Sequence, residues 1–139
     1  MTEDFLKLAT KKFTKAEIEA TGAKIEDINQ MAFLKLIEFR ESINCSVHLI
    51  FNGITTGNHK SPGHPSGRAF DIRVPNANSY DVFKVAIDAG FKKIGIYWNG
   101  NEYSYHLEDS KKSSFWSGKK DSPGVGSWKF SPLIVNPRD

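Results

Sequence analysis

Apolar residues recur at helical spacing in the first third of the chain, and shorter apolar runs follow further along. Thr14 and Glu17 have the spacing of a helix-capping box, and Phe13 and Ile18 can form a hydrophobic staple around it, so a short helix is expected to begin there. Residues 24–44 then predict a longer helix packed against a core, because one apolar stripe runs through Ile28, Ala32, Leu36, Phe39 and Ile43.

Four later segments are rich in strand-forming or alternating residues. They predict strands at positions 47–51, 68–74, 93–98 and 102–107. The last two flank Asn99-Gly100-Asn101, a connection that suits a β-hairpin. A further helix is expected between the second and third strands, from about Tyr80 to Ala89.

The composition is that of one soluble globular domain spanning residues 1–139. Hydrophobic residues make up 39% of the chain and charged residues 25%, a balance that allows a core to form at this length without disulfides. Cys45 is the only cysteine, which excludes an internal disulfide and a cysteine-rich zinc finger. Residues 119–139 are expected to form an irregular but packed tail, because residues such as Trp128 and Phe130 are too apolar for a disordered one.

The N-terminus does not resemble a signal peptide, and no apolar stretch approaches the length that crosses a membrane. Cytoplasmic synthesis without a signal peptide and the absence of a membrane partner are therefore expected.

The net charge of +3 is a mild excess that does not choose among anionic partners. No nucleic-acid partner is expected, because the lysines near the C-terminus fit a solvated face better; they are Lys111, Lys112, Lys119 and Lys120.

Three residues carry potential metal chemistry. His64 lies near the end of a glycine- and proline-rich loop expected at 53–67, Asp71 lies on the strand that follows, and His106 lies on the later strand of the hairpin. Zinc accepts imidazole nitrogen and carboxylate oxygen, and catalytic zinc sites keep three protein ligands and one open position. From the residues alone, a loop histidine near an aspartate is also compatible with a surface hydrogen bond.

The segment HPSGRAFDI, at positions 64–72, resembles the HxxGxAxDI signature of the M15 family of zinc peptidases, which contains D-alanyl-D-alanine carboxypeptidases and phage endolysins. Ser61 shortly before this segment, and the sequence HLE at 106–108, are also similar to that family. The similarity follows the chain in order from about residue 13 to residue 118.

The resemblance implies one Zn²⁺ held by His64, Asp71 and His106. It also implies an α+β fold of the hedgehog/DD-peptidase type, in which a small antiparallel sheet has helices packed on one side. Gly67 has a physical role in this interpretation, because a small residue lets the chain turn sharply while the ligands converge.

A zinc peptidase also needs a group that takes a proton from water and passes it to the leaving amine. Several members of the family carry an acidic residue three positions before the last zinc histidine and others a histidine two positions before it, where this chain has Tyr103 and Ser104. Glu108 is the first candidate, because residues two apart on a strand share a face, and Glu102 is the second. Asp109 is expected to face away, and a solvated role for all three carboxylates stays open.

The family's serine-glycine-tyrosine-arginine sequence after the first strand, whose arginine can hold a terminal carboxylate, has no counterpart at residues 51–55. Removal of a C-terminal residue and cleavage within a cross-link or stem peptide therefore both stay open. Candidate substrate-contacting residues are Ser61, His59, Arg68, Trp98 and Tyr105.

The leading hypothesis is a monomeric zinc-dependent peptidase that hydrolyses amide bonds of bacterial peptidoglycan stem peptides. The resemblance implies a phage or prophage setting, in which the enzyme acts at the cell wall after release. The alternative is a catalytically silent zinc-binding module that binds cell-wall peptide or a protein partner, and the missing acid at Tyr103 favours it.

Overall fold

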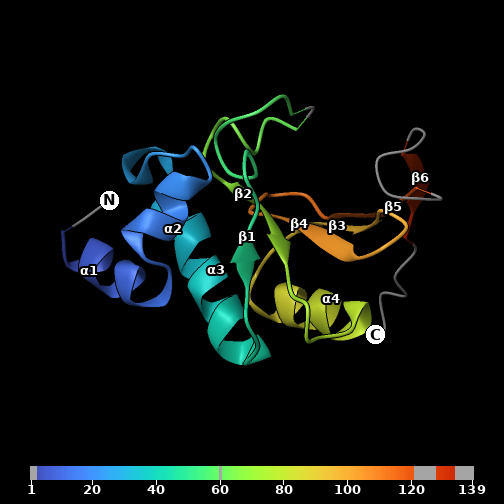
Figure 1. Cartoon of the computed structure of the whole chain (residues 1–139), viewed down its shortest axis with the longest axis horizontal. Coiled ribbons are helices and arrows are strands. Elements are labelled where there is room, and N and C mark those ends of the chain that lie inside the picture. Colours follow the sequence, from blue (N-terminus) through green and yellow to red (C-terminus); the bar gives the residue numbers. More distant parts are fainter. Residues whose placement is uncertain (1–2, 60, 121–127, 134–139) are drawn as a thin grey trace.

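The computed structural model describes residues 3–59, 61–120 and 128–133, and the fold is reported for these residues. Figure 1 shows the whole chain. The helical elements are α1 (Glu3–Lys12), α2 (Lys15–Ala20), the short 3₁₀ turn η1 (Ile25–Asp27), α3 (Gln30–Ile43) and α4 (Ser79–Asp88). The strands are β1 (His48–Leu49), β2 (Ala69–Arg73), β3 (Lys93–Trp98), β4 (Tyr103–Glu108), β5 (Ser114–Lys119) and β6 (Lys129–Pro132).

The strands form one sheet in the order β1-β2-β4-β3-β5-β6. All neighbouring strands are antiparallel except β3 and β5, which run parallel. The α+β class expected from the sequence is therefore confirmed, with a sheet that is mostly rather than wholly antiparallel. Within the described residues, none of the helices is both long enough and apolar enough to span a bilayer.

One face of the sheet carries the hydrophobic core. Strand register places a line of apolar side chains across four strands, namely Phe70, Leu107, Ile94 and Phe115. Phe33 of α3 contacts Phe70 with ring centroids 6.3 Å apart, and Phe83 of α4 contacts Phe115 at 5.2 Å. Each fully buried side chain of this size contributes roughly 1.5–3 kcal/mol. The opposite face, which the long loop between β1 and β2 approaches in Figure 1, is thereby left for the polar residues of the same strands.

The N-terminal helices follow the sequence pattern closely. Thr14 accepts a hydrogen bond from the backbone N–H of Glu17, whose side chain returns a bond to the Thr14 N–H, as the capping-box spacing predicted. Phe13 and Ile18 are fully buried. The expected helix over 24–44 is instead broken, because the Asn29 side chain accepts from the N–H of Ala32 and starts α3 separately from the preceding 3₁₀ turn.

Two strand predictions need correction. The strand expected at 47–51 is reduced to β1, because the N–H of Gly53 bonds back to the carbonyl of Ile50 and Asn52 adopts a φ of 59°, so the chain turns. The tail expected at 119–139 to be irregular contains a strand, β6, whose four residues are exposed, although the Phe130 ring contacts the Tyr97 ring. Residues 121–127 and 134–139 of that prediction lie outside the described residues.

Candidate metal centre

Strand register brings Asp71 and His106 together. Asp71 lies on β2 and His106 on β4, and the two residues are direct partners in the antiparallel pairing of these strands. Directly opposed side chains on one face of a sheet are close neighbours. Asp71 and His106 therefore project side by side from the face opposite the core, and they form one side of the candidate site.

His64 reaches this pair from the loop between β1 and β2. A turn closed by the Gly67 N–H, which donates to the His64 carbonyl at 2.9 Å, carries the histidine. Gly67 has a φ of +72°, and its carbonyl accepts from the N–H of Asn29 at 2.9 Å, so the turn is seated on the break before α3. A side chain at Gly67 would meet the Asp27 carbonyl, which explains why glycine occupies this position.

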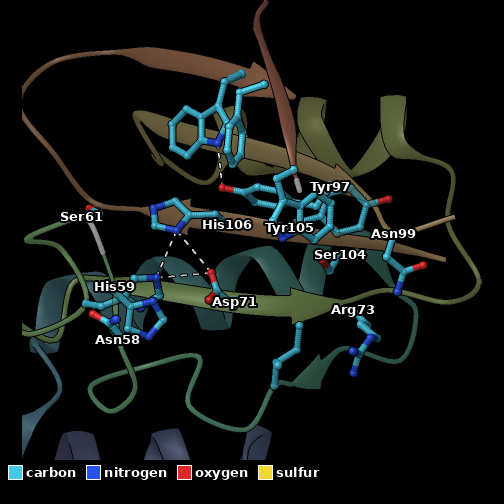
Figure 2. Close-up of a pocket in the computed structure, with 15 residues that line it drawn as sticks. Asn58, His59, Ser61, Asp71, Arg73, Tyr97, Asn99, Ser104, Tyr105 and His106 are labelled. Atoms are coloured by element: carbon cyan, nitrogen blue, oxygen red, sulfur yellow. Dashed lines mark hydrogen bonds and ion pairs between the residues drawn. The ribbon is translucent and has the colours of Figure 1, made fainter. Parts of the chain in front are cut away.

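Three atoms meet where these segments converge. His64 Nε2 lies 3.2 Å from His106 Nδ1 and 3.4 Å from Asp71 Oδ1, and His106 Nδ1 lies 3.3 Å from the same Asp71 oxygen. Figure 2 shows this triangle of dashed lines at the side of the cleft. Zinc with bonds of about 2.0–2.1 Å to nitrogen and oxygen has tetrahedral ligand atoms about 3.3–3.4 Å apart. The three atoms thus have the spacing of one face of a zinc tetrahedron.

The outward nitrogens of both histidines are already hydrogen-bonded. His64 Nδ1 donates to the Ile54 carbonyl at 2.8 Å, and His106 Nε2 donates to Glu108 Oε1 at 2.8 Å. In the neutral tautomers that these bonds favour, the imidazole protons lie on the outer nitrogens, and His64 Nε2 and His106 Nδ1 carry lone pairs. Two lone pairs and a carboxylate oxygen then face one another, and a cation between them would turn mutual repulsion into attraction.

The pKa values of the site residues reflect the same arrangement. Burial raises the pKa of Asp71, but hydrogen bonds and charge from His106 and His64 outweigh it and lower the pKa to about 2. Burial lowers the pKa of His106, but hydrogen bonds and charge from Asp71 and Glu108 outweigh it and raise the pKa. The pKa of Glu108 is lowered, because hydrogen bonds from His106 and Ser61 outweigh its burial. These shifts favour a protonated His106 between two carboxylates, and a metal ion bound at the centre would replace the proton on His106 Nδ1.

His59 forms a wider group with two of these residues. Ligand atoms of His59, His64 and Asp71 all lie within 4.8 Å of one another, so a His-His-Asp group that could hold a metal ion is present. The His59 ring stacks on the His64 ring, with centroids 3.7 Å apart and planes 19° apart. Because the two rings are stacked and nearly parallel, their nitrogen lone pairs lie in separate planes and do not converge on one point. His106, whose ring is turned by 74° from that of His64, has the better orientation for a shared ion.

The structure does not support a proton-transfer role for either glutamate predicted from the sequence. Glu108 is buried and shares the face of His106, but it contacts the outer nitrogen, so the imidazole ring lies between its carboxylate and the three converging atoms. Glu102 is exposed and pairs with Arg73 at 2.9 Å. Asp71 is the only carboxylate lining the cleft beside the site, as far as the structure describes the chain.

This cleft has a volume of about 700 Å³ and is lined partly by residues that the sequence predicted. His59 and Ser61, which the sequence proposed as substrate contacts, both line it. Tyr105 borders it, but its side chain alternates with that of His106 and belongs to the core. Other lining residues follow the alternation of β2, β3, β4 and β5 or come from the tail; they include Arg73, Tyr97, Ser104, Trp116, Trp128 and Phe130.

Two predicted substrate contacts lie elsewhere. Gly95 is the register partner of His106, and Trp98 is three positions further along the same strand. Because side chains alternate along a strand, Trp98 and its partner Tyr103 lie on the opposite face of the sheet from His106. Arg68 is exposed and lines a separate hollow of about 430 Å³ together with Lys93 and other residues. Residues two positions from Asp71 and from His106 share their face of the sheet, so strand alternation would have indicated Arg73 and Ser104 as cleft residues instead.

The Tyr105 hydroxyl is buried and has no hydrogen-bond partner among the described residues. Burial, with a smaller contribution from Tyr103, raises its pKa to about 12. A buried, unpaired hydroxyl costs about 1–3 kcal/mol. We expect Tyr105→Phe to leave the free energy of unfolding unchanged or to raise it by up to about 1 kcal/mol, measured by urea denaturation. A clear loss of stability would show that the hydroxyl has a partner.

Comparison with models of known protein families, with curated proteins and with solved structures finds no match for this chain.

Proposed function

We propose that the protein binds one zinc ion through His64, Asp71 and His106 and hydrolyses amide bonds of bacterial peptidoglycan stem peptides. The observation that carries the proposal is the convergence of three lone-pair-bearing atoms, 3.2–3.4 Å apart, at the wall of an open cleft. Three protein ligands beside open space are the arrangement of a catalytic rather than a structural zinc site. Bound zinc would polarise a peptide carbonyl and acidify water.

The residues around the centre have separate roles in this proposal. His64 and His106 are oriented by the Ile54 carbonyl and the Glu108 carboxylate, which hold each ring in the tautomer that presents a lone pair. Ser61 donates to Glu108 Oε1 at 2.6 Å and fixes that carboxylate in turn. Glu108 is therefore assigned to orienting His106, in place of the general-base role that the sequence suggested.

The choice of substrate rests on the cleft and on the sequence resemblance. Aromatic side chains line much of the cleft, and polar groups of Asn99, Ser104 and Arg73 are also present, a mixture that suits an extended peptide. The HPSGRAFDI motif resembles that of peptidases acting on cell-wall peptides. Release from the producing cell and action at the wall are part of the same proposal.

A catalytically silent zinc-binding module is the second candidate. It is favoured by the lack of a carboxylate other than Asp71 along the described part of the cleft, because zinc peptidases use a proton-transfer group. In this alternative, the cleft binds a wall peptide or a protein partner without cleaving it.

The test is to incubate the zinc-loaded protein with purified peptidoglycan and identify new amino groups by mass spectrometry. We expect new amines that disappear on chelation and return when zinc is restored, because hydrolysis requires the ion. His106→Ala is the inactive control, and His48→Ala, exposed on β1, is the matched histidine control that retains activity. One bound zinc without new amines would favour the silent module, and failure to bind zinc would contradict both candidates.

A further inference from the structure

A tyrosine and a tryptophan form a hydrogen-bonded pair in the cleft beside the candidate metal centre. Tyr97 lies on β3, two residues from Gly95, the register partner of His106, and so shares the face of His106. Trp116 on β5 is the parallel partner of Gly95, and its Nε1 donates to the Tyr97 hydroxyl at 2.7 Å. Both residues line the cleft.

Gly95 makes room for this pair. A Cβ atom at Gly95 would lie 2.6 Å from Trp116 Nε1, so the indole can cross the strand here only because the intervening residue has no side chain. The Trp116 ring also packs against the His106 ring, with centroids 5.3 Å apart. The indole is therefore held between the metal-centre histidine and the phenol, and it fixes the position of the Tyr97 hydroxyl.

The Tyr97 hydroxyl has its own proton available. Its oxygen accepts the indole proton, and within the described residues no acceptor takes the phenol O–H. Burial, reinforced by the negative charge of Asp71, raises the pKa of Tyr97 despite the opposing hydrogen bond from Trp116, so the phenol stays protonated near neutral pH. Figure 2 shows the hydroxyl pointing toward the side of the cleft where His106 and Asp71 lie.

We propose that Tyr97 is a catalytic residue that donates a hydrogen bond to the carbonyl oxygen of the scissile amide, and that Trp116 is a positioning residue for Tyr97. The inference rests on the proposed peptidase function. As water adds to the carbonyl carbon, the π electron pair moves to the carbonyl oxygen, and the phenol donates to that oxygen while keeping its proton. The proton released by water passes to the nitrogen, and the carbon–nitrogen bond breaks.

This role differs from a purely structural one. Tyr97 also contacts Trp128 and Phe130 through its ring, with centroids 5.4 and 6.3 Å apart. Those contacts need the ring alone, whereas donation to an oxyanion needs the hydroxyl. Removal of the single oxygen atom therefore separates the two roles.

The experiment is Tyr97→Phe in the zinc-loaded protein, assayed on a muropeptide. We expect kcat to fall about 100- to 1,000-fold, the usual loss for one oxyanion donor, with KM and bound zinc nearly unchanged. Tyr103→Phe, which removes an exposed phenol from the opposite face, is the matched control and keeps parental kcat. Trp116→Phe is expected to show a smaller loss, because the ring remains but the donor to Tyr97 is gone.

A second readout does not depend on turnover. A phosphinate analogue of the peptide carries a tetrahedral centre with anionic oxygens, and its affinity can be measured by isothermal titration calorimetry. We expect Tyr97→Phe to weaken phosphinate binding by a factor similar to the loss in kcat while leaving the affinity for the product peptide unchanged. Equal phosphinate affinity in the parent and in Tyr97→Phe would overturn the assignment. A parent that binds the phosphinate through Tyr97 but releases no amines would contradict the peptidase function and leave the tyrosine contact standing.

Discussion

Replacing His64, Asp71 or His106 by alanine is expected to remove stoichiometric zinc binding. Each of these residues supplies one of three converging atoms, and two remaining ligands cannot form the three-ligand site that zinc enzymes use. Peptidoglycan hydrolysis should disappear with the metal. The measurement is elemental metal analysis after dialysis against a low zinc concentration, with circular dichroism to establish that each variant is folded.

His59→Ala is the informative control for this series. His59 lies within reach of His64 and Asp71, but its ring is stacked on His64, and its Nε2 lies 2.6 Å from the Asn52 carbonyl. We expect His59→Ala to retain about one zinc. A variant series in which His59→Ala loses zinc and His106→Ala keeps it would assign the site to His59, His64 and Asp71 instead.

The parts of the site that follow from local rules were accessible from the sequence. Strand alternation places Asp71 on one face of β2 and His106 on one face of β4, and the Gly67 turn was expected to bring the loop histidine towards them. Pairing of Asp71 with His106 then depends on strand order, which alternation does not supply. The family resemblance provided that long-range step as an expectation, and in the structure Asp71 and His106 are register partners on β2 and β4.

Other features depended on register, which a single sequence does not reveal. Trp98 and Tyr97 are neighbours, and only the pairing of Gly95 with His106 shows that Tyr97 is the one facing the cleft. The break before α3 could not be seen in the apolar stripe, because the stripe residues on both sides of the break, Ile28 before it and Ala32 after it, are buried. The parallel pairing of β5 with β3 likewise joins segments whose relation is set by the tertiary fold.

Glu108 illustrates the limit of face assignments most clearly. The sequence correctly placed Glu108 on the same face as His106, and the two side chains are in contact at 2.8 Å. Alternation gives the face of a sheet but not the direction in which a long side chain leans along it. Here the carboxylate meets the outer nitrogen of the imidazole, where Ser61 also reaches it, and not the open space beside Asp71.

Glu108→Gln is therefore expected to weaken zinc binding about 10- to 100-fold, the usual effect of losing a partner behind a metal-ligating histidine. Glutamine keeps the size of the side chain, but a neutral amide oxygen holds the His106 proton less strongly than a carboxylate and lowers the basicity of the inner nitrogen. The measurement is competition against a chromophoric zinc chelator, with Glu102→Gln as a matched glutamate control on the exposed hairpin. A general base would behave differently: zinc affinity would stay at the parental value while hydrolysis fell about 100- to 10,000-fold. That second outcome would return Glu108 to the role suggested by the sequence, and it would require the carboxylate to rotate away from His106 and Ser61 when substrate binds.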